Sequence, residues 1–179
     1  VAQLYGFLVL GLICLAAPLL HLWLGAELDE RSILVGQITM IGLWANALAN
    51  VPYAYIQARG NSRYTALLHL LELPLYVAML YVFGGWLGLY GVAMAFTLRA
   101  VLDCVVLFHK ARLLDPDLLT RLVGPTLLIA TAMAATPWMT DWLTGIAGAS
   151  ILCGALMLIT WLQMPDQARV WIDRHLKRA

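Results

Sequence analysis

The sequence has 179 residues, of which 63% are apolar and only 12% are charged. This composition lies well outside the usual range of water-soluble domains and indicates an integral membrane protein. The formal net charge of +1 gives no support for a nucleic-acid partner.

Apolar stretches divide the chain into six predicted spans. Each is close to the ~20 residues that a helix needs to cross a hydrocarbon core of ~30 Å. Strands are excluded because the stretches are apolar on nearly every side, without alternation. The sequence therefore predicts an all-α, polytopic membrane protein with six transmembrane helices, at 4–24, 33–56, 64–83, 87–108, 122–139 and 142–164, followed by a tail, 165–179.

The basic residues predict the orientation of these spans. Most of them fall in two alternate loops, at 57–63 and 109–121, and in the tail. By the positive-inside rule these segments lie in the cytoplasm. We therefore expect a multi-pass protein of the bacterial inner membrane with both chain ends cytoplasmic. Glu27, Asp29 and Asp141 are then expected on the periplasmic side.

The chain begins at Val1 without a basic segment before the first span. We therefore expect a fragment of a longer protein without a signal peptide. The three cysteines lie inside apolar spans and are expected to be packed thiols rather than disulfides. The histidines are scattered without ligand spacing, so no metal site is predicted. No catalytic residue and no cofactor is predicted either.

The second span contains a polar face. Asn46 and Asn50 lie one turn apart on that face, and Pro52 follows. Because proline cannot donate a backbone N–H, we expect the helix to kink or open at Pro52. The two amides either line a cavity or only bond to a neighbouring helix, and the sequence leaves both open.

In the third span the strongly polar residues fall on a single stripe. Thr65, His69, Glu72 and Tyr76 follow helical spacing, so the stripe cannot face lipid. The stripe is therefore expected to face another helix. Pro74 lies just beyond Glu72 and frees a further backbone carbonyl.

The fourth span contributes charges at membrane depth. A small-residue face with Gly84 and Gly88 precedes Arg99 and Asp103. The simplest interpretation is an ion pair between Arg99 and Asp103 within one helix. Glu72 in the third span would then be unpaired. Since its height falls between those of Arg99 and Asp103, we expect one charged cluster in which Arg99 bridges both carboxylates.

The last two spans are less polar. Gly124 and Pro125 are expected to open the fifth span, and Pro137 to close it. Asp141 is a predicted N-cap of the sixth span. In the tail, apolar residues share one face with basic residues beside them, which is typical of an amphipathic helix on an anionic membrane surface, although a solvated basic tail fits as well.

Several segments taken together resemble a known family. They are QARGNSRY at 57–64, HLLELPLY at 69–76, GLYGVAMA at 88–95 and LRAVLD at 98–103. In this order and spacing they resemble bacterial polysaccharide-type flippases. These are the O-antigen and lipid-linked oligosaccharide translocases of the multidrug/oligosaccharidyl-lipid/polysaccharide exporter superfamily.

The resemblance implies the C-terminal part of a two-lobed flippase of about twelve to fourteen helices around a central cavity. Alternating access would carry an undecaprenyl-pyrophosphate-linked glycan across the membrane. The implied partners are the bilayer, the lipid-linked glycan, the rest of the same protein and other polysaccharide-assembly membrane proteins.

Candidate pathway residues are the polar groups at membrane depth. Arg99 is the one cation expected there, and a pyrophosphate needs such a partner. Glu72 and Asp103 are alternatively expected to bind a coupling proton or monovalent cation. Arg59 and Arg63 fit a cytoplasmic entrance but equally serve as ordinary topology determinants. The full candidate set is Asn46, Asn50, His69, Glu72, Arg99 and Asp103 in the pathway, with Gln57, Arg59 and Arg63 at the entrance.

Two other functions remain open from the sequence. One is a multidrug or cation antiporter of the same superfamily. The other is a membrane-embedded enzyme of envelope assembly, which normally needs a sizeable loop to position its acceptor. The predicted loops are all short.

Overall fold

The structure is a computed structural model that describes residues 2–164. Nearly all of these residues are helical and none forms a strand, so the predicted all-α class is confirmed. The predicted amphipathic tail, 165–179, lies outside the described residues. The helices are α1 (Ala2–Cys14), α2 (Ala16–Leu24), α3 (Arg31–Ala58), α4 (Ser62–Leu87), α5 (Leu89–Ala111), α6 (Pro116–Ala135) and α7 (Trp142–Leu162), with 3₁₀ turns η1 (Gly25–Glu27) and η2 (Thr136–Trp138).

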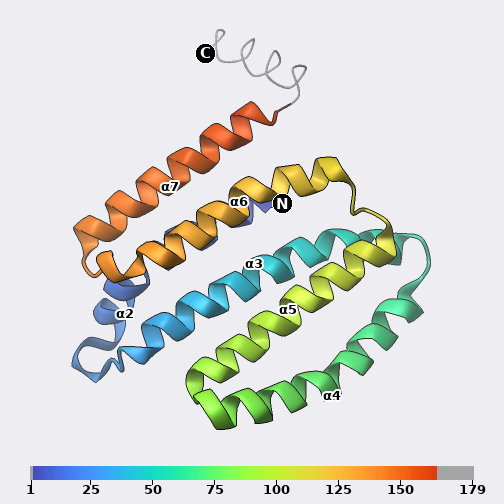
Figure 1. Cartoon of the computed structure of the whole chain (residues 1–179), viewed down its shortest axis with the longest axis horizontal. Coiled ribbons are helices and arrows are strands. Elements are labelled where there is room, and N and C mark those ends of the chain that lie inside the picture. Colours follow the sequence, from blue (N-terminus) through green and yellow to red (C-terminus); the bar gives the residue numbers. More distant parts are fainter. Residues whose placement is uncertain (1, 165–179) are drawn as a thin grey trace.

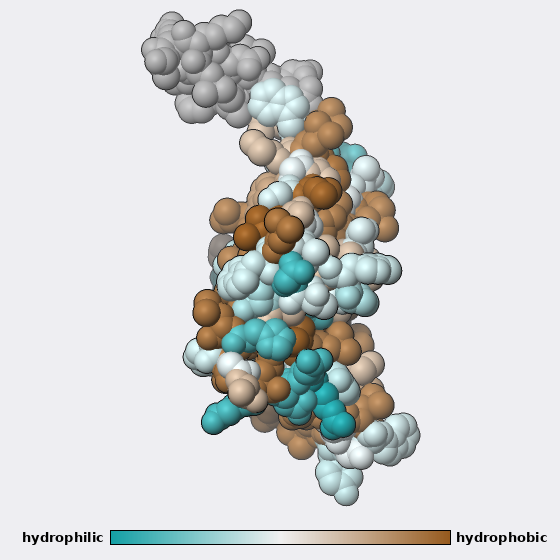
Figure 2. Space-filling model, turned by 90° about the vertical axis from the view of Figure 1, so that its left-hand side faces the viewer, coloured by the Kyte–Doolittle hydropathy of each residue, from teal (hydrophilic) through white to brown (hydrophobic). Residues whose placement is uncertain are grey.

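The long helices lie as near-parallel rods, in the order α7, α6, α3, α5, α4 from one edge to the other (Figure 1). Five of them are long and apolar enough to cross a membrane, and α1 with α2 forms a bent sixth candidate. The chain is therefore a multi-pass membrane protein. Figure 2 views the side with the α2–α3 turn, where hydrophilic side chains gather among apolar ones.

The predicted first span is two helices rather than one. The axes of α1 and of the segment Ala16–Glu27 differ by 61°. Pro18 explains the break, because it has no N–H to donate to the carbonyl of Cys14, four residues earlier. At the same place the Gln37 amide, buried in α3, donates a hydrogen bond of 3.2 Å to the carbonyl of Ile13. Gln37 is not among the residues that the sequence predicted to be important.

The second span does not open at its proline. Helix α3 runs without interruption through Pro52 to Ala58. Pro52 is among the most deeply buried side chains of the described residues. The helix therefore does not open at Pro52, although the missing hydrogen-bond donor remains.

The fifth predicted span begins earlier than expected. Asp115 caps α6, because its carboxylate accepts a hydrogen bond of 2.6 Å from the N–H of Leu118. Pro116 occupies the first helical position, which suits its fixed φ. Pro125 consequently lies inside α6 and does not open it. This start signal was present in the sequence.

Helices α3 and α5 approach each other closely through small residues. A Cβ on Gly42 of α3 would lie 2.7 Å from the ring of Phe96 in α5. Beside it, the hydroxyl of Thr97 donates a hydrogen bond of 2.8 Å to the carbonyl of Ile38. Small faces and interhelical hydrogen bonds are the usual means of packing helices in lipid. Helix α5 is thereby fixed against α3, and α4 packs on the other side of α5.

Helices α1, α6 and α7 share an apolar core. Helix α1 contacts α3, α6 and α7, and Leu10 and Ile13 on it are fully buried. Leu156 of α7 and Ile129 of α6 close this core. No charged side chain belongs to it among the described residues. The charged groups at membrane depth lie instead between α4 and α5.

Candidate charged site between two helices

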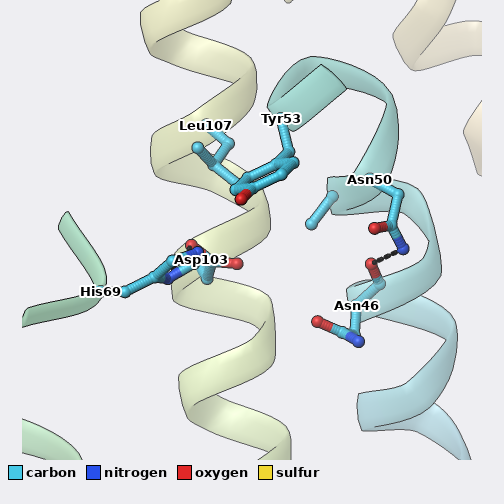
Figure 3. Close-up of a pocket in the computed structure, with 7 residues that line it drawn as sticks. Asn46, Asn50, Tyr53, His69, Asp103 and Leu107 are labelled. Carbon is cyan, nitrogen blue, oxygen red and sulfur yellow. Dashed lines mark hydrogen bonds and ion pairs between the residues drawn. The ribbon is translucent and has the colours of Figure 1, made fainter. Parts of the chain in front are cut away.

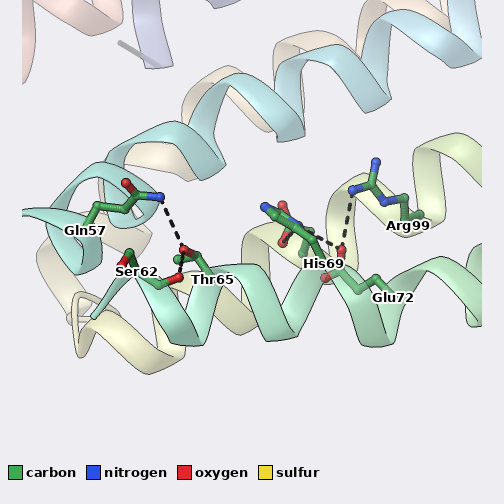
Figure 4. A network of polar contacts seen from close by, with 7 residues as sticks. Gln57, Ser62, Thr65, His69, Glu72 and Arg99 are labelled. Carbon is green, nitrogen blue, oxygen red and sulfur yellow. Dashed lines mark hydrogen bonds and ion pairs between the residues drawn. The ribbon is translucent and has the colours of Figure 1, made fainter. Parts of the chain in front are cut away.

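The polar stripe of α4 faces α5, as its spacing predicts. The Glu72 carboxylate lies 3.5 Å from the Arg99 guanidinium, measured from Oε2 to Nη2. His69 Nδ1 lies 3.5 Å from the same Glu72 oxygen and 3.9 Å from Asp103 Oδ1. Figure 4 shows His69 and Arg99 on either side of Glu72. The four side chains form one cluster, which we call the charged site.

The pairing within the charged site differs from the expectation. Glu72 and Arg99 do pair, but Asp103 pairs with His69, and no Arg99–Asp103 ion pair occurs among the described residues. The reason is directional, because helical side chains lean toward the N-terminus. Arg99 leans along α5 toward Glu72, 3.5 Å away, and an i, i+4 pair with the basic residue first is the less favourable order on a helix.

The two carboxylates are more buried than their partners. The side chains of Glu72 and Asp103 are 11% and 6% exposed, against 32% for Arg99 and 40% for His69. Asp103 Oδ1 is buried and accepts no hydrogen bond. Most buried polar atoms in native proteins have a partner, so this oxygen calls for an explanation.

A cavity of about 300 Å³ adjoins the charged site. Asn46, Asn50 and Tyr53 of α3 line it from one side, and His69 and Asp103 from the other (Figure 3). The Asn50 amide donates a 3.1 Å hydrogen bond to the Asn46 carbonyl within α3. Both asparagines therefore line a cavity, and neither donates a hydrogen bond to a neighbouring helix within the part of the chain that the structure describes.

Two aromatic rings support the charged site. The Tyr53 ring stacks on the His69 imidazole with ring centroids 5.8 Å apart. The Tyr76 ring centroid lies 5.7 Å from the Arg99 guanidinium carbon, within the range of a cation–π contact. Arg99 thus has a second partner besides Glu72. Tyr76 lies on the predicted polar stripe, but its contact with Arg99 could not be predicted from the sequence.

The predicted entrance residues lie apart from the charged site, where α3 ends and α4 begins. The Gln57 amide donates a 3.3 Å hydrogen bond to the Thr65 hydroxyl and so ties α3 to α4 (Figure 4). Arg59 lies over the Tyr55 ring, 4.4 Å from its centroid. Arg63 is exposed. Of these three residues, Gln57 has a structural role.

A second basic residue at this end is also placed on an aromatic ring. The Lys110 ammonium lies 4.5 Å from the centroid of the Tyr64 ring, which joins the end of α5 to the start of α4. Together with Arg59 over Tyr55, it forms what we call the aromatic–basic pairs. These pairs mark one end of the bundle.

The histidines are scattered along the sequence, which predicts no metal site, but one of them meets two carboxylates in the fold. In the structure His69, Glu72 and Asp103 each offer a ligand atom, and these atoms lie within 4.8 Å of one another. The i, i+3 spacing of His69 and Glu72 was the available signal, since such residues share a helix face. The contribution of Asp103 depends on the packing of α5 against α4.

The fold and the charged site define a multi-pass helical membrane protein with ionisable groups and a polar cavity at membrane depth. The chain is similar to a protein of Shigella flexneri named "Putative O-antigen transporter", with 37% identity over 102 residues. The match covers 57% of this chain and 23% of that protein, so it spans about a quarter of the relative. No family model and no solved structure matches the chain. The similarity confirms the resemblance to O-antigen flippases.

Proposed function

We propose that the chain is part of a flippase that moves undecaprenyl-pyrophosphate-linked oligosaccharide across the bacterial cytoplasmic membrane for O-antigen or polysaccharide export. The observation that carries this proposal is Arg99, a cation at membrane depth paired with Glu72 close to a polar cavity. The similarity to a protein named as an O-antigen transporter supports the same substrate class.

The chemistry of the substrate explains why such a site is useful. A pyrophosphate cannot cross hydrocarbon without cationic and hydrogen-bonding partners. Arg99 is one-third exposed and can exchange its contact with Glu72 for a phosphate oxygen. Asn46 and Asn50 offer amides to sugar hydroxyls along the cavity. We assign the chain to transport and not to an enzyme.

The same site offers a means of coupling. With His69 neutral, the charges of Glu72, Asp103 and Arg99 leave a net negative cluster. A proton or a monovalent cation would neutralise it when Arg99 turns to the substrate. No cofactor is needed for this exchange.

The chain is proposed to act with the remainder of a longer protein, because an alternating-access cavity forms between two lobes. In proteoliposomes, the full-length protein is expected to translocate lipid-linked glycan, while the 179-residue chain alone does not. Translocation by the chain alone, above empty liposomes, would contradict this assignment.

We also propose that the end carrying the aromatic–basic pairs is cytoplasmic. In a background without native cysteines, Asp29→Cys should react with an impermeant maleimide added to intact spheroplasts, and Asn61→Cys should not. Both positions are exposed, so accessibility reports the side of the membrane. The opposite labelling pattern would reverse the topology.

The test of function is complementation of a strain that lacks its O-antigen flippase. Full-length protein with Arg99→Gln should insert normally, as judged by immunoblot of membranes, but should not restore O-antigen on lipopolysaccharide. The matched control is Arg121→Gln, an exposed residue of α6 far along the chain from the charged site. Normal O-antigen with Arg99→Gln would reject the proposal. Restored efflux of a cationic dye without O-antigen would favour an antiporter, and altered glycan length an enzyme.

A further inference from the structure

We propose that His69, Glu72 and Asp103 form a binding site for a divalent transition-metal cation such as Zn²⁺. This inference concerns binding alone and stands or falls independently of the proposed transport function. It rests on three ligand atoms from two helices, His69 Nδ1 and one oxygen of each carboxylate, that lie within 4.8 Å of one another.

The spacing of these atoms suits a small metal ion. Ligands bound tetrahedrally at ~2.0–2.1 Å from zinc lie roughly 3.3 Å apart. His69 Nδ1 lies 3.5 Å from Glu72 Oε2 and 3.9 Å from Asp103 Oδ1. Small side-chain rotations therefore bring all three atoms into a coordination sphere. His69 and Glu72 are one turn apart on α4, so the helix itself holds two of the ligands together.

Asp103 gives an independent indication of a ligand. Its side chain is more than nine-tenths buried, and its Oδ1 accepts no hydrogen bond. The nearest cationic partner is His69, 3.9 Å away, which is beyond hydrogen-bond distance and charged only when protonated. Leaving a carboxylate oxygen buried without a partner is costly. A metal ion between Asp103 and His69 would remove that cost.

The imidazole indicates which class of metal the site prefers. Mg²⁺ and Ca²⁺ favour sites made of oxygen ligands, whereas imidazole nitrogen with carboxylate oxygen suits Zn²⁺ and its neighbours. The Tyr53 ring stacked on His69 holds the imidazole in place. The adjoining cavity of about 300 Å³, which His69 and Asp103 line, leaves room for water as a fourth ligand.

Arg99 competes with the metal. Its guanidinium lies 3.5 Å from Glu72 Oε2, the oxygen that the metal would use. Tyr76, with its ring centroid 5.7 Å away, gives Arg99 an alternative partner when Glu72 turns to the metal. Because the guanidinium repels a second cation, removal of Arg99 should tighten metal binding.

The test is a titration of the purified full-length protein, isolated through an affinity tag without histidine. Zn²⁺ binding is followed by calorimetry, with Co²⁺ absorption as a probe of coordination geometry. His69→Ala is expected to abolish one site or weaken it at least ~10-fold, and Asp103→Asn likewise. Arg99→Gln is expected to strengthen it. Excess Mg²⁺ or Ca²⁺ should not displace the metal.

The control is His109→Ala, an exposed histidine of α5 outside the charged site, which should leave Zn²⁺ binding unchanged. His69 is 40% exposed, so its substitution removes less buried contact than that of Asp103 and tests the site even if Asp103→Asn prevents folding. Unchanged Zn²⁺ binding in His69→Ala would overturn the proposal. An equal loss in His109→Ala, or the absence of any Zn²⁺ binding by the unmodified protein, would overturn it as well.

Discussion

The α4–α5 pair and the α1–α7 pair hold helices together by different means. Between α4 and α5 lie two carboxylates, an imidazole and a guanidinium, and α4 is otherwise little buried. Between α1 and α7 the contacts are mainly apolar, with Leu10 and Leu156 fully buried. Apolar contacts give little advantage over lipid in a membrane, so the second pair depends on shape. The α4–α5 pair depends instead on which ionisable side chain meets which.

The largest effect is expected at the backbone contact that sets the α4–α5 pair. A Cβ on Gly91 would collide with the Phe83 carbonyl, which is backbone rather than the end of a flexible side chain. Gly91→Ala should therefore destabilise the protein by more than ~3 kcal/mol, measured by thermal unfolding in detergent. Gly85→Ala is the matched control, because nothing lies within 4 Å of its Cβ position. Equal stability of the two variants would show that the pair is not set by close backbone approach.

A smaller loss of stability is expected when the ion pair of the charged site is removed, and it shows whether the pairing of charges or only the shape of the side chains matters there. Arg99→Leu leaves Glu72 without its guanidinium and should cost about 1–2 kcal/mol, reduced from the value for a fully buried pair because Arg99 is one-third exposed. The double variant Glu72→Leu with Arg99→Leu should unfold within ~1 kcal/mol of the original protein, since apolar residues often replace an ion pair. A double variant less stable than the single one would mean that Glu72 matters for folding beyond its pair.

A smaller effect again is expected at the side-chain hydrogen bond beside the bend between α1 and α2. Gln37→Leu removes the donor to the Ile13 carbonyl and should cost about 1 kcal/mol. Thr39→Val is the control, because the Thr39 hydroxyl bonds only to the Val35 carbonyl of its own helix. Should both variants unfold at the same temperature, the bend is held by apolar shape alone.

The smallest effect is expected at the start of α7 and depends on pH. The Thr144 backbone N–H donates a 2.9 Å hydrogen bond to the Asp141 carboxylate, which lowers the pKa of Asp141 below its ordinary 3.8. The stabilisation is therefore complete above that value and is lost as the pH falls through the lower pKa of the folded state. Unfolding of Asp141→Ala against the original protein should show a gap that closes in acid. A gap independent of pH would contradict the role of the carboxylate.

Much of this architecture follows from the sequence, because span length and polar stripes depend on periodicity alone. The facing of Glu72 toward Arg99 is of this kind, and so is the cap at Asp141. The partner of each charge was not predictable, because it depends on the direction of side chains on two helices. The cavity beside Asn46 likewise depends on how α3 packs against α5.

The bend between α1 and α2 is a different case. Its cause, Pro18, was visible in the sequence, but apolar composition alone suggested a single continuous span. A proline in a long apolar run therefore predicts a missing hydrogen-bond donor. Whether the helix breaks there depends on how the surrounding helices pack against it. Pro18 coincides with a break, and Pro52 does not.

The aromatic–basic pairs indicate how far into the transmembrane electric field the charged site lies. The Tyr64 ring contacts the Lys110 ammonium at this end of the bundle. Tyr64 lies eight residues before Glu72, or about 12 Å along α4. In a core of ~30 Å this is about 40% of the way across the membrane field. A monovalent cation that reaches Glu72 from that end therefore gains or loses about 0.9 kcal/mol per 100 mV. Under the proposed coupling, occupancy of the charged site by such a cation is therefore expected to vary with the membrane potential.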